Sequence, residues 1–132
     1  MTFQTHDIVY EREERKERAG SSLFFLFMDR SKLYKSKRWK KMRAAVLRRD
    51  GYMCQMSKRY GKHKEAQTVH HIFPVERYPE LAFEPWNLIS LTNEEHNRMH
   101  DRATHEMTEY GKELLRRTAR AKGMEIPERY KH

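Results

Sequence analysis

The stretch VHHIFPVERYPELAFEPWNLISLTNEEHNRMH, residues 69–100, decides the fold of this chain. It holds His70, His71, His96 and His100, which are four of the eight histidines. Residues 68–73 are rich in β-branched and aromatic side chains and predict a strand that a proline closes. NLISL, at residues 87–91, predicts a second strand. The connection between them is too long for a tight hairpin, so we expect part of it to pack as an ordered loop.

A helix is predicted directly after the second strand. Thr92 and Glu95 have the spacing of a capping box, and the acidic side chains of the first turn suit the helix dipole. On a helix, His96 and His100 stand at i and i+4 and share one face, so both imidazoles can reach one ion.

A second helix is predicted upstream, with Ser36 as its N-cap and Gly51 as its stop. Its apolar stripe consists of Trp39, Met42, Ala45 and Val46. The other face is densely basic, which fits either a solvated surface or, as we favour, contacts to nucleic-acid phosphates. These basic residues are Lys37, Arg38, Lys40, Lys41, Arg43, Arg48 and Arg49.

The remaining segments carry weaker signals. Residues 54–61 predict a turn region. Thr108 is predicted to cap a last helix that runs through Leu114, Leu115 and Ala119 and stops near Gly123. We divide the chain into an N-terminal extension (1–30), a domain with flanking helices (31–123) and a charged, loose tail (124–132). The apolar run 23–28 suits a buried strand, a helical plug or a patch that faces a partner, and we assign it no chemistry.

Composition narrows the class of protein. With 37% hydrophobic and 36% charged residues among 132, the chain can build only a small core. A net charge of +9 favours a polyanionic partner such as DNA. No apolar run approaches the ~18 residues of a membrane helix. The single cysteine, Cys54, excludes an intrachain disulfide and fits a reducing compartment, so we expect a cytoplasmic protein with no membrane partner.

The histidines of residues 69–100 suggest a metal site, and the alternative interpretation is that they are ordinary strand or surface residues. Imidazoles of His70, His96 and His100 would suit one borderline divalent ion and leave open positions for water or a phosphate oxygen. His71 would then be left as a general base, because an imidazole titrates near neutrality. One objection is geometric: neighbours in a regular strand face opposite ways, so the strand must twist or end there.

These residues resemble the HNH endonucleases, a family built on a ββα-metal motif. The resemblance runs from about residue 36 to residue 100, roughly half of the chain, and rests on His71, Asn87 and His96, with His70 as the first metal ligand. It implies an α+β fold, a mostly helical small domain around the ββα motif. It also implies hydrolysis of DNA phosphodiester bonds, with Asn87 holding the loop by hydrogen bonds. Small phage-encoded members are associated with DNA packaging, which implies a terminase or portal partner.

The chain departs from this family at one feature. Many members bind a structural zinc through two cysteine pairs, and here the four places hold Cys54, Ser57, Thr92 and Glu95. A hydroxyl is a poor zinc ligand, so we expect no Cys-type structural zinc and a buried, apolar role for Cys54. The catalytic ion stays open among zinc, manganese, nickel, cobalt and magnesium.

Three functions therefore compete. The leading one is a metal-dependent DNA endonuclease, which nicks or cuts both strands. The second is a non-catalytic DNA-binding module whose histidines hold a structural zinc. The third is a packaging accessory that binds the terminase through residues 23–28 and cuts only in that complex. The sequence leaves open RNA cleavage, the choice of strand, the cleavage specificity and the oligomeric state.

Overall fold

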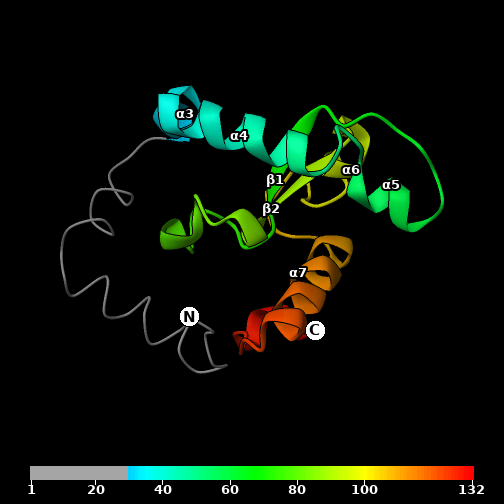
Figure 1. Ribbon diagram of the computed structural model, residues 1–132. Coiled ribbons are helices and arrows are strands. Elements are labelled where there is room, and N and C mark those ends of the chain that lie inside the picture. Colours follow the sequence, from blue (N-terminus) through cyan, green and yellow to red (C-terminus); the bar gives the residue numbers. More distant parts are fainter. Residues whose placement is uncertain (1–29) are drawn as a thin grey trace.

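The computed structural model describes residues 30–132, so the apolar run 23–28 lies outside the described residues. The fold is α+β, as predicted, with a two-stranded sheet and several helices (Figure 1). The elements, in chain order, are α3 (Arg30–Lys35), α4 (Lys37–Arg49), α5 (Gln55–Arg59), β1 (Thr68–His71), β2 (Leu88–Leu91), α6 (Asn93–Asn97) and α7 (Glu109–Lys122). Short 3-10 turns occupy Pro79–Leu81, Pro85–Asn87 and Glu128–Tyr130.

The two strands pair antiparallel at the centre of the domain, between α4 and α7 (Figure 1). The register sets His70 opposite Ile89 and His71 opposite Leu88. The predicted first strand is two residues too long, because the chain bends at Ile72 directly after His71. The strand therefore ends at the histidine pair.

Helix α4 forms where the sequence predicts it. The Ser36 hydroxyl accepts a hydrogen bond from the backbone N–H of Trp39 at 3.1 Å and so caps the first turn. Trp39 and Val46 are buried and form a small core with Val69 and Leu88 of the strands. Ala45, which we predicted in the same stripe, is exposed instead.

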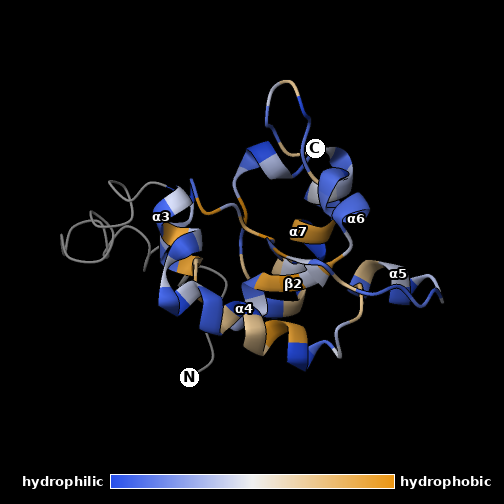
Figure 2. Ribbon diagram, turned by 90° about the horizontal axis from the view of Figure 1, so that it is seen from above, coloured by the Kyte–Doolittle hydropathy of each residue, from blue (hydrophilic) through white to orange (hydrophobic). Residues whose placement is uncertain are grey.

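The larger core lies around α7. Thr108 caps this helix and Gly123 ends it in a left-handed conformation, with φ at +67°, as the sequence predicts. Leu114 and Leu115 pack in a cluster with residues of the strands and of the loop between them, and Figure 2 shows apolar residues on both α7 and β2. The prediction of a loose tail is wrong, because Tyr130 is buried in this same cluster.

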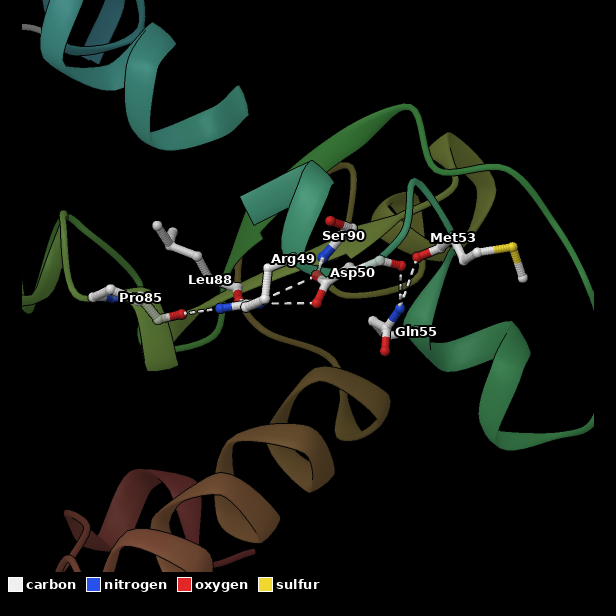
Figure 3. Close-up of polar contacts among 7 residues, drawn as sticks. All are labelled: Arg49, Asp50, Met53, Gln55, Pro85, Leu88 and Ser90. Carbon is white, nitrogen blue, oxygen red and sulfur yellow. Dashed lines mark hydrogen bonds and ion pairs between the residues drawn. The ribbon is translucent and has the colours of Figure 1, made fainter. Parts of the chain in front are cut away.

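A polar brace joins the end of α4 to β2 (Figure 3). The guanidinium of Arg49 donates hydrogen bonds to the carbonyl oxygens of Pro85 at 2.7 Å and of Leu88 at 2.6 Å. The carboxylate of Asp50 pairs with Arg49 and also accepts a hydrogen bond from the backbone N–H of Ser90 at 3.1 Å. One ion pair thereby fixes the helix against the strand and the loop before it.

The segment after α4 differs from the predicted turn region, because residues Gln55–Arg59 form the short helix α5. Its N-cap residue, Cys54, is fully buried, which confirms the apolar position predicted for it. Burial raises the pKa of the Cys54 thiol, but hydrogen bonds from Ser57 and from the backbone of Thr92 outweigh burial and lower it. The fold therefore brings Ser57 and Thr92 close to the Cys54 sulfur. These are three of the four positions at which many members of the resembled family carry zinc-binding cysteines.

No helix within residues 30–132 has the length and apolar character that crossing a membrane requires.

The close approach of α7 to the chain before it generates a stability prediction. A Cβ on Gly111 would lie 2.6 Å from the Met99 carbonyl oxygen and 2.7 Å from Met107 Cγ. Gly111→Ala should therefore lower the free energy of unfolding by about 1–3 kcal/mol, whereas alanine normally stabilises a helix relative to glycine. Urea denaturation checks this, with Arg120→Ala on the exposed face of α7 as a near-neutral control. An unchanged or raised midpoint for Gly111→Ala would contradict the close packing.

Candidate functional site

Three imidazoles from separate parts of the chain lie close together. The ring centroid of His70, on β1, lies 5.3 Å from that of His96 and 5.8 Å from that of His100. His96 lies on α6 as predicted, but the prediction that the same helix carries His100 is wrong, because α6 ends at Asn97.

A different local structure delivers His100. Its backbone forms an isolated bridge with Met107, and residues 101–106 make a turn between them. The carboxylate of Asp101 stabilises that turn by accepting hydrogen bonds from the N–H groups of Ala103 at 2.8 Å and Thr104 at 3.0 Å. The His100 ring thus reaches His70 through a closed loop and not through helical spacing.

The predicted capping box of α6 is only half formed. The Thr92 hydroxyl accepts a hydrogen bond from the N–H of Glu95 at 3.1 Å. The Glu95 carboxylate, however, accepts a hydrogen bond from the Tyr110 hydroxyl at 2.6 Å and pairs with Arg98. These contacts tie α6 to α7 and hold the element that carries His96.

The spacing of the three rings fits a shared metal ion. An ion about 2.1 Å from each of two imidazole nitrogens leaves their ring centroids about 5 Å apart. Within residues 30–132, however, no three His, Cys, Asp or Glu side chains already have the arrangement of a metal site. The donor set is nevertheless chemically suitable, because imidazole nitrogens bind borderline divalent ions.

Burial keeps these three imidazoles neutral. It lowers the pKa of His70 well below its usual range, and the neighbouring histidines lower it further. Burial also lowers the pKa of His96 and of His100. Neutral imidazole is the form that binds a metal, so the site needs no proton release near neutrality.

His71 is held in a separate environment on the other side of the strand end. Its ring stacks on Trp39 of α4, with centroids 5.0 Å apart and planes inclined by 23°. Its Nε2 lies 3.0 Å from the carbonyl oxygen of Ala82. Because a carbonyl only accepts, Nε2 carries the hydrogen and donates it.

The protonation of His71 follows from these contacts. Burial lowers the pKa of His71 to about 4, although the hydrogen bond to Ala82 acts in the opposite direction. The ring is therefore neutral near pH 7, and with the hydrogen on Nε2 its lone pair is on Nδ1. His71 can accept a proton at Nδ1.

His70 and His71 nevertheless line one cleft. This answers the objection that neighbouring residues of a strand face opposite ways. The cleft measures about 710 Å³, and α4 forms one wall of it. His96, His100 and His105 also line the cleft. The His70 ring lies near His96 and the His71 ring stacks on Trp39 of α4, so the end of β1 directs both rings into one cleft.

Asn87 lies beneath this site and is fully buried. Its Oδ1 accepts a hydrogen bond from the N–H of Phe73 at 2.7 Å. Its Nδ2 donates to the carbonyl oxygens of Phe73 at 3.2 Å and Leu81 at 3.1 Å. The amide thus ties together both ends of the loop between the strands, next to the Ala82 carbonyl that binds His71.

The predicted phosphate-binding residues of α4 separate into groups. Lys40 and Arg43 line the histidine cleft. The Arg38 guanidinium lies 3.9 Å over the Phe83 ring, and Arg49 belongs to the brace already described. The remaining three residues are exposed and do not line the cleft: Lys37, Lys41 and Arg48.

Several groups of the site were not predicted from the sequence. Trp39 was assigned only to an apolar stripe, yet it also stacks on His71. Tyr34 and His105 line the cleft without any local pattern that marks them. The Ala82 carbonyl is a backbone group, which side-chain patterns do not reveal.

Comparisons with known proteins identify a solved structure of the same kind. No model of a protein family matches the chain, and no curated protein does. The chain is similar to the HNH endonuclease of the deep-sea thermophilic bacteriophage GVE2, whose crystal structure contains a manganese ion. The two are 30% identical, the match covers 67% of this chain and 85% of that one, and the TM-score is 0.51.

The hydrogen bonds of Asn87 generate a second prediction. Asn87→Ala should cost about 2–4 kcal/mol of unfolding free energy, because it leaves one N–H and two carbonyl oxygens buried without this partner. Asn87→Asp should be destabilised more at pH 8 than at pH 4, because only the protonated carboxyl can donate to a carbonyl oxygen. Urea denaturation at both pH values measures this. Equal destabilisation of Asn87→Asp at the two pH values would contradict the assigned donor role.

Proposed function

The chain belongs to the HNH endonuclease family, and from this we propose that it is a metal-dependent endonuclease that hydrolyses phosphodiester bonds of DNA. The family assigns a nuclease function in general terms, and the substrate, the metal and the role of each residue are our proposal. The observation that carries it is the state of His71. This ring is neutral, is held through Nε2 by the Ala82 carbonyl and lines a cleft beside three further imidazoles.

In the proposed reaction, His71 acts as the general base. Its Nδ1 accepts a proton from a water molecule while the water oxygen attacks phosphorus and the bond to the 3′ oxygen breaks. A pKa of about 4 means that nearly every molecule holds the basic form at neutral pH, although such a base is weak. A phosphate anion entering the cleft would raise this pKa, because negative charge favours the imidazolium.

His70, His96 and His100 are the proposed metal ligands. A divalent ion held there would supply Lewis-acid stabilisation of the charge that develops on the phosphate and on the leaving oxygen. Manganese is the first ion to test, since the phage GVE2 enzyme was solved with it. Zinc, nickel and cobalt also suit imidazole ligands, whereas magnesium prefers oxygen.

Asn87 is proposed to position the base and not to react. It bonds the Leu81 carbonyl, and the next residue, Ala82, supplies the carbonyl that binds His71. Trp39 supports the same ring from its face. Together these contacts fix the direction in which Nδ1 points.

Lys40 and Arg43 are the proposed phosphate contacts on α4. Both line the cleft that holds the histidines, and both carry the charge that a DNA backbone requires. Arg49 is left out of this proposal, because its guanidinium is engaged by two carbonyl oxygens and a carboxylate.

Two further functions stay as alternatives. A DNA-binding module with a structural zinc would use the same three imidazoles, and it predicts that metal removal unfolds the chain. A role in phage genome packaging, in the host cytoplasm and with a terminase or portal partner, rests on the sequence resemblance and on the phage source of the solved relative. The nuclease is favoured over the binding module because of His71, whose environment a structural zinc would not require.

Plasmid cleavage tests the proposed base. The wild-type protein should nick or linearise plasmid DNA with manganese and lose this activity in EDTA. His71→Ala should lower the cleavage rate by about 10²- to 10⁴-fold, because a general base contributes about that much. Manganese affinity, measured by calorimetry, should be largely retained in this variant.

His63→Ala is the matched control, since His63 is exposed and lies outside the cleft. It should cut at the wild-type rate. If the wild type binds DNA but cuts with none of the five ions, or if EDTA unfolds it, the binding module replaces the nuclease.

A pair of charge variants tests the proposed phosphate contacts. Lys40→Gln/Arg43→Gln and Lys37→Gln/Lys41→Gln have equal net charge, but only the first pair lines the cleft. Fluorescence anisotropy in EDTA gives the dependence of DNA affinity on salt. The cleft pair should reduce the slope of log K against log salt by about 2, since each phosphate contact contributes about 0.9. An equal loss of slope in both pairs would contradict a path through the cleft.

A further inference from the structure

An exposed tyrosine stands at the wall of the histidine cleft. Tyr34, Tyr52 and Tyr60 are the large apolar side chains that residues 30–132 expose. Of these, Tyr34 lines the cleft, and its residue is 40% exposed. Tyr52 and Tyr60 do not line it. An aromatic ring kept in contact with water inside a reactive cleft requires an explanation.

The Tyr34 ring rests on a rigid aromatic support. It makes a T-shaped contact with Trp39, with centroids 5.3 Å apart, and its centroid lies 6.2 Å from that of His71. Trp39 is itself buried and stacked on His71. Tyr34 is therefore supported from within the protein, and its ring lies close to the proposed general base.

The surroundings of Tyr34 suit nucleic acid. Lys40 and Arg43 line the same cleft, and burial raises the pKa of Tyr34, so its hydroxyl stays uncharged near phosphate. Aromatic rings set beside basic side chains are the usual platform for unpaired nucleotides, because every base has a face that can stack.

We propose that Tyr34 stacks a nucleobase that has left the double helix beside the scissile phosphate. This rests on the proposed nuclease function and names its substrate class: DNA with unpaired nucleotides at the cleavage position, such as single strands, flaps and gaps. In a duplex the bases face inward and stack on one another. The Tyr34 ring adjoins the space proposed for the phosphate, so a base can reach this ring only after the base has left the stack. Intact duplex DNA resists this unstacking, whereas unpaired DNA does not.

The test measures binding in EDTA, where DNA is not cut. The probes are a single-stranded oligonucleotide, a duplex with a two-nucleotide gap and the intact duplex, with 2-aminopurine in the unpaired positions. The wild type should bind the first two more tightly and quench 2-aminopurine fluorescence. Tyr34→Ala should weaken binding to these two by about 5- to 150-fold, with little effect on intact duplex and no quenching.

Two variants separate stacking from simple packing against Trp39. Tyr34→Phe keeps the ring and should behave as wild type. Tyr34→Leu keeps apolar bulk without the ring and should behave as Tyr34→Ala. Tyr60→Ala, an exposed tyrosine outside the cleft, should leave affinity and quenching unchanged.

The outcomes distinguish this proposal from the nuclease itself. Equal effects of Tyr34→Ala on all three DNAs, or none on any, would overturn the stacking role even if His71-dependent cleavage is found. Selective loss on unpaired DNA together with no cleavage by any ion would support the stacking role and overturn the nuclease.

Discussion

The buried amide of Asn87 makes three hydrogen bonds to the backbone of the connection between the two strands. Between β1 and β2 the chain passes through two 3-10 turns instead of a tight hairpin, and it must still close the sheet. Asn87 supplies one acceptor to Phe73 and donors to Phe73 and Leu81. The following residue, Ala82, orients His71. The proposed base therefore depends on a side chain that does not contact it, and the cost of leaving buried backbone groups unsatisfied enforces the arrangement.

Polar braces complement the packing of a small core. The Arg49–Asp50 pair fastens α4 to β2, and the hydrogen bond from Tyr110 to Glu95 fastens α7 to α6. The first brace holds the helix that carries Trp39, Lys40 and Arg43, and the second holds the helix that carries His96. Hydrogen bonds and ion pairs are directional, whereas hydrophobic burial is not. These contacts therefore define the orientation of the helices more closely than hydrophobic burial does. A chain that is 36% charged thus uses some of its charges to define the site.

Charge is distributed unevenly around the cleft. His70 and His71 are neutral because burial lowers their pKa values, whereas Lys40 and Arg43 carry positive charge at the wall of the cleft. Under the proposed function, this arrangement would attract a polyanion toward unprotonated imidazoles. The large net charge of +9 would favour encounter with any polyanion, while the position of these two cations would direct it to the histidines.

The sequence by itself determined the order of strand, loop, strand and helix, the helix caps at Ser36 and Thr108, and the resemblance to HNH endonucleases. These depend on local hydrogen bonds and short spacings, which a linear pattern records. Only the tertiary structure decided that His100 reaches its neighbours through a bridged loop, that Trp39 stacks on the proposed base and that Arg49 serves the fold. Each of these joins an element to groups that a local pattern does not bring together, such as Arg49 and a carbonyl 39 positions along the chain. Such contacts form only because folding closes the intervening chain, and no local propensity encodes that closure.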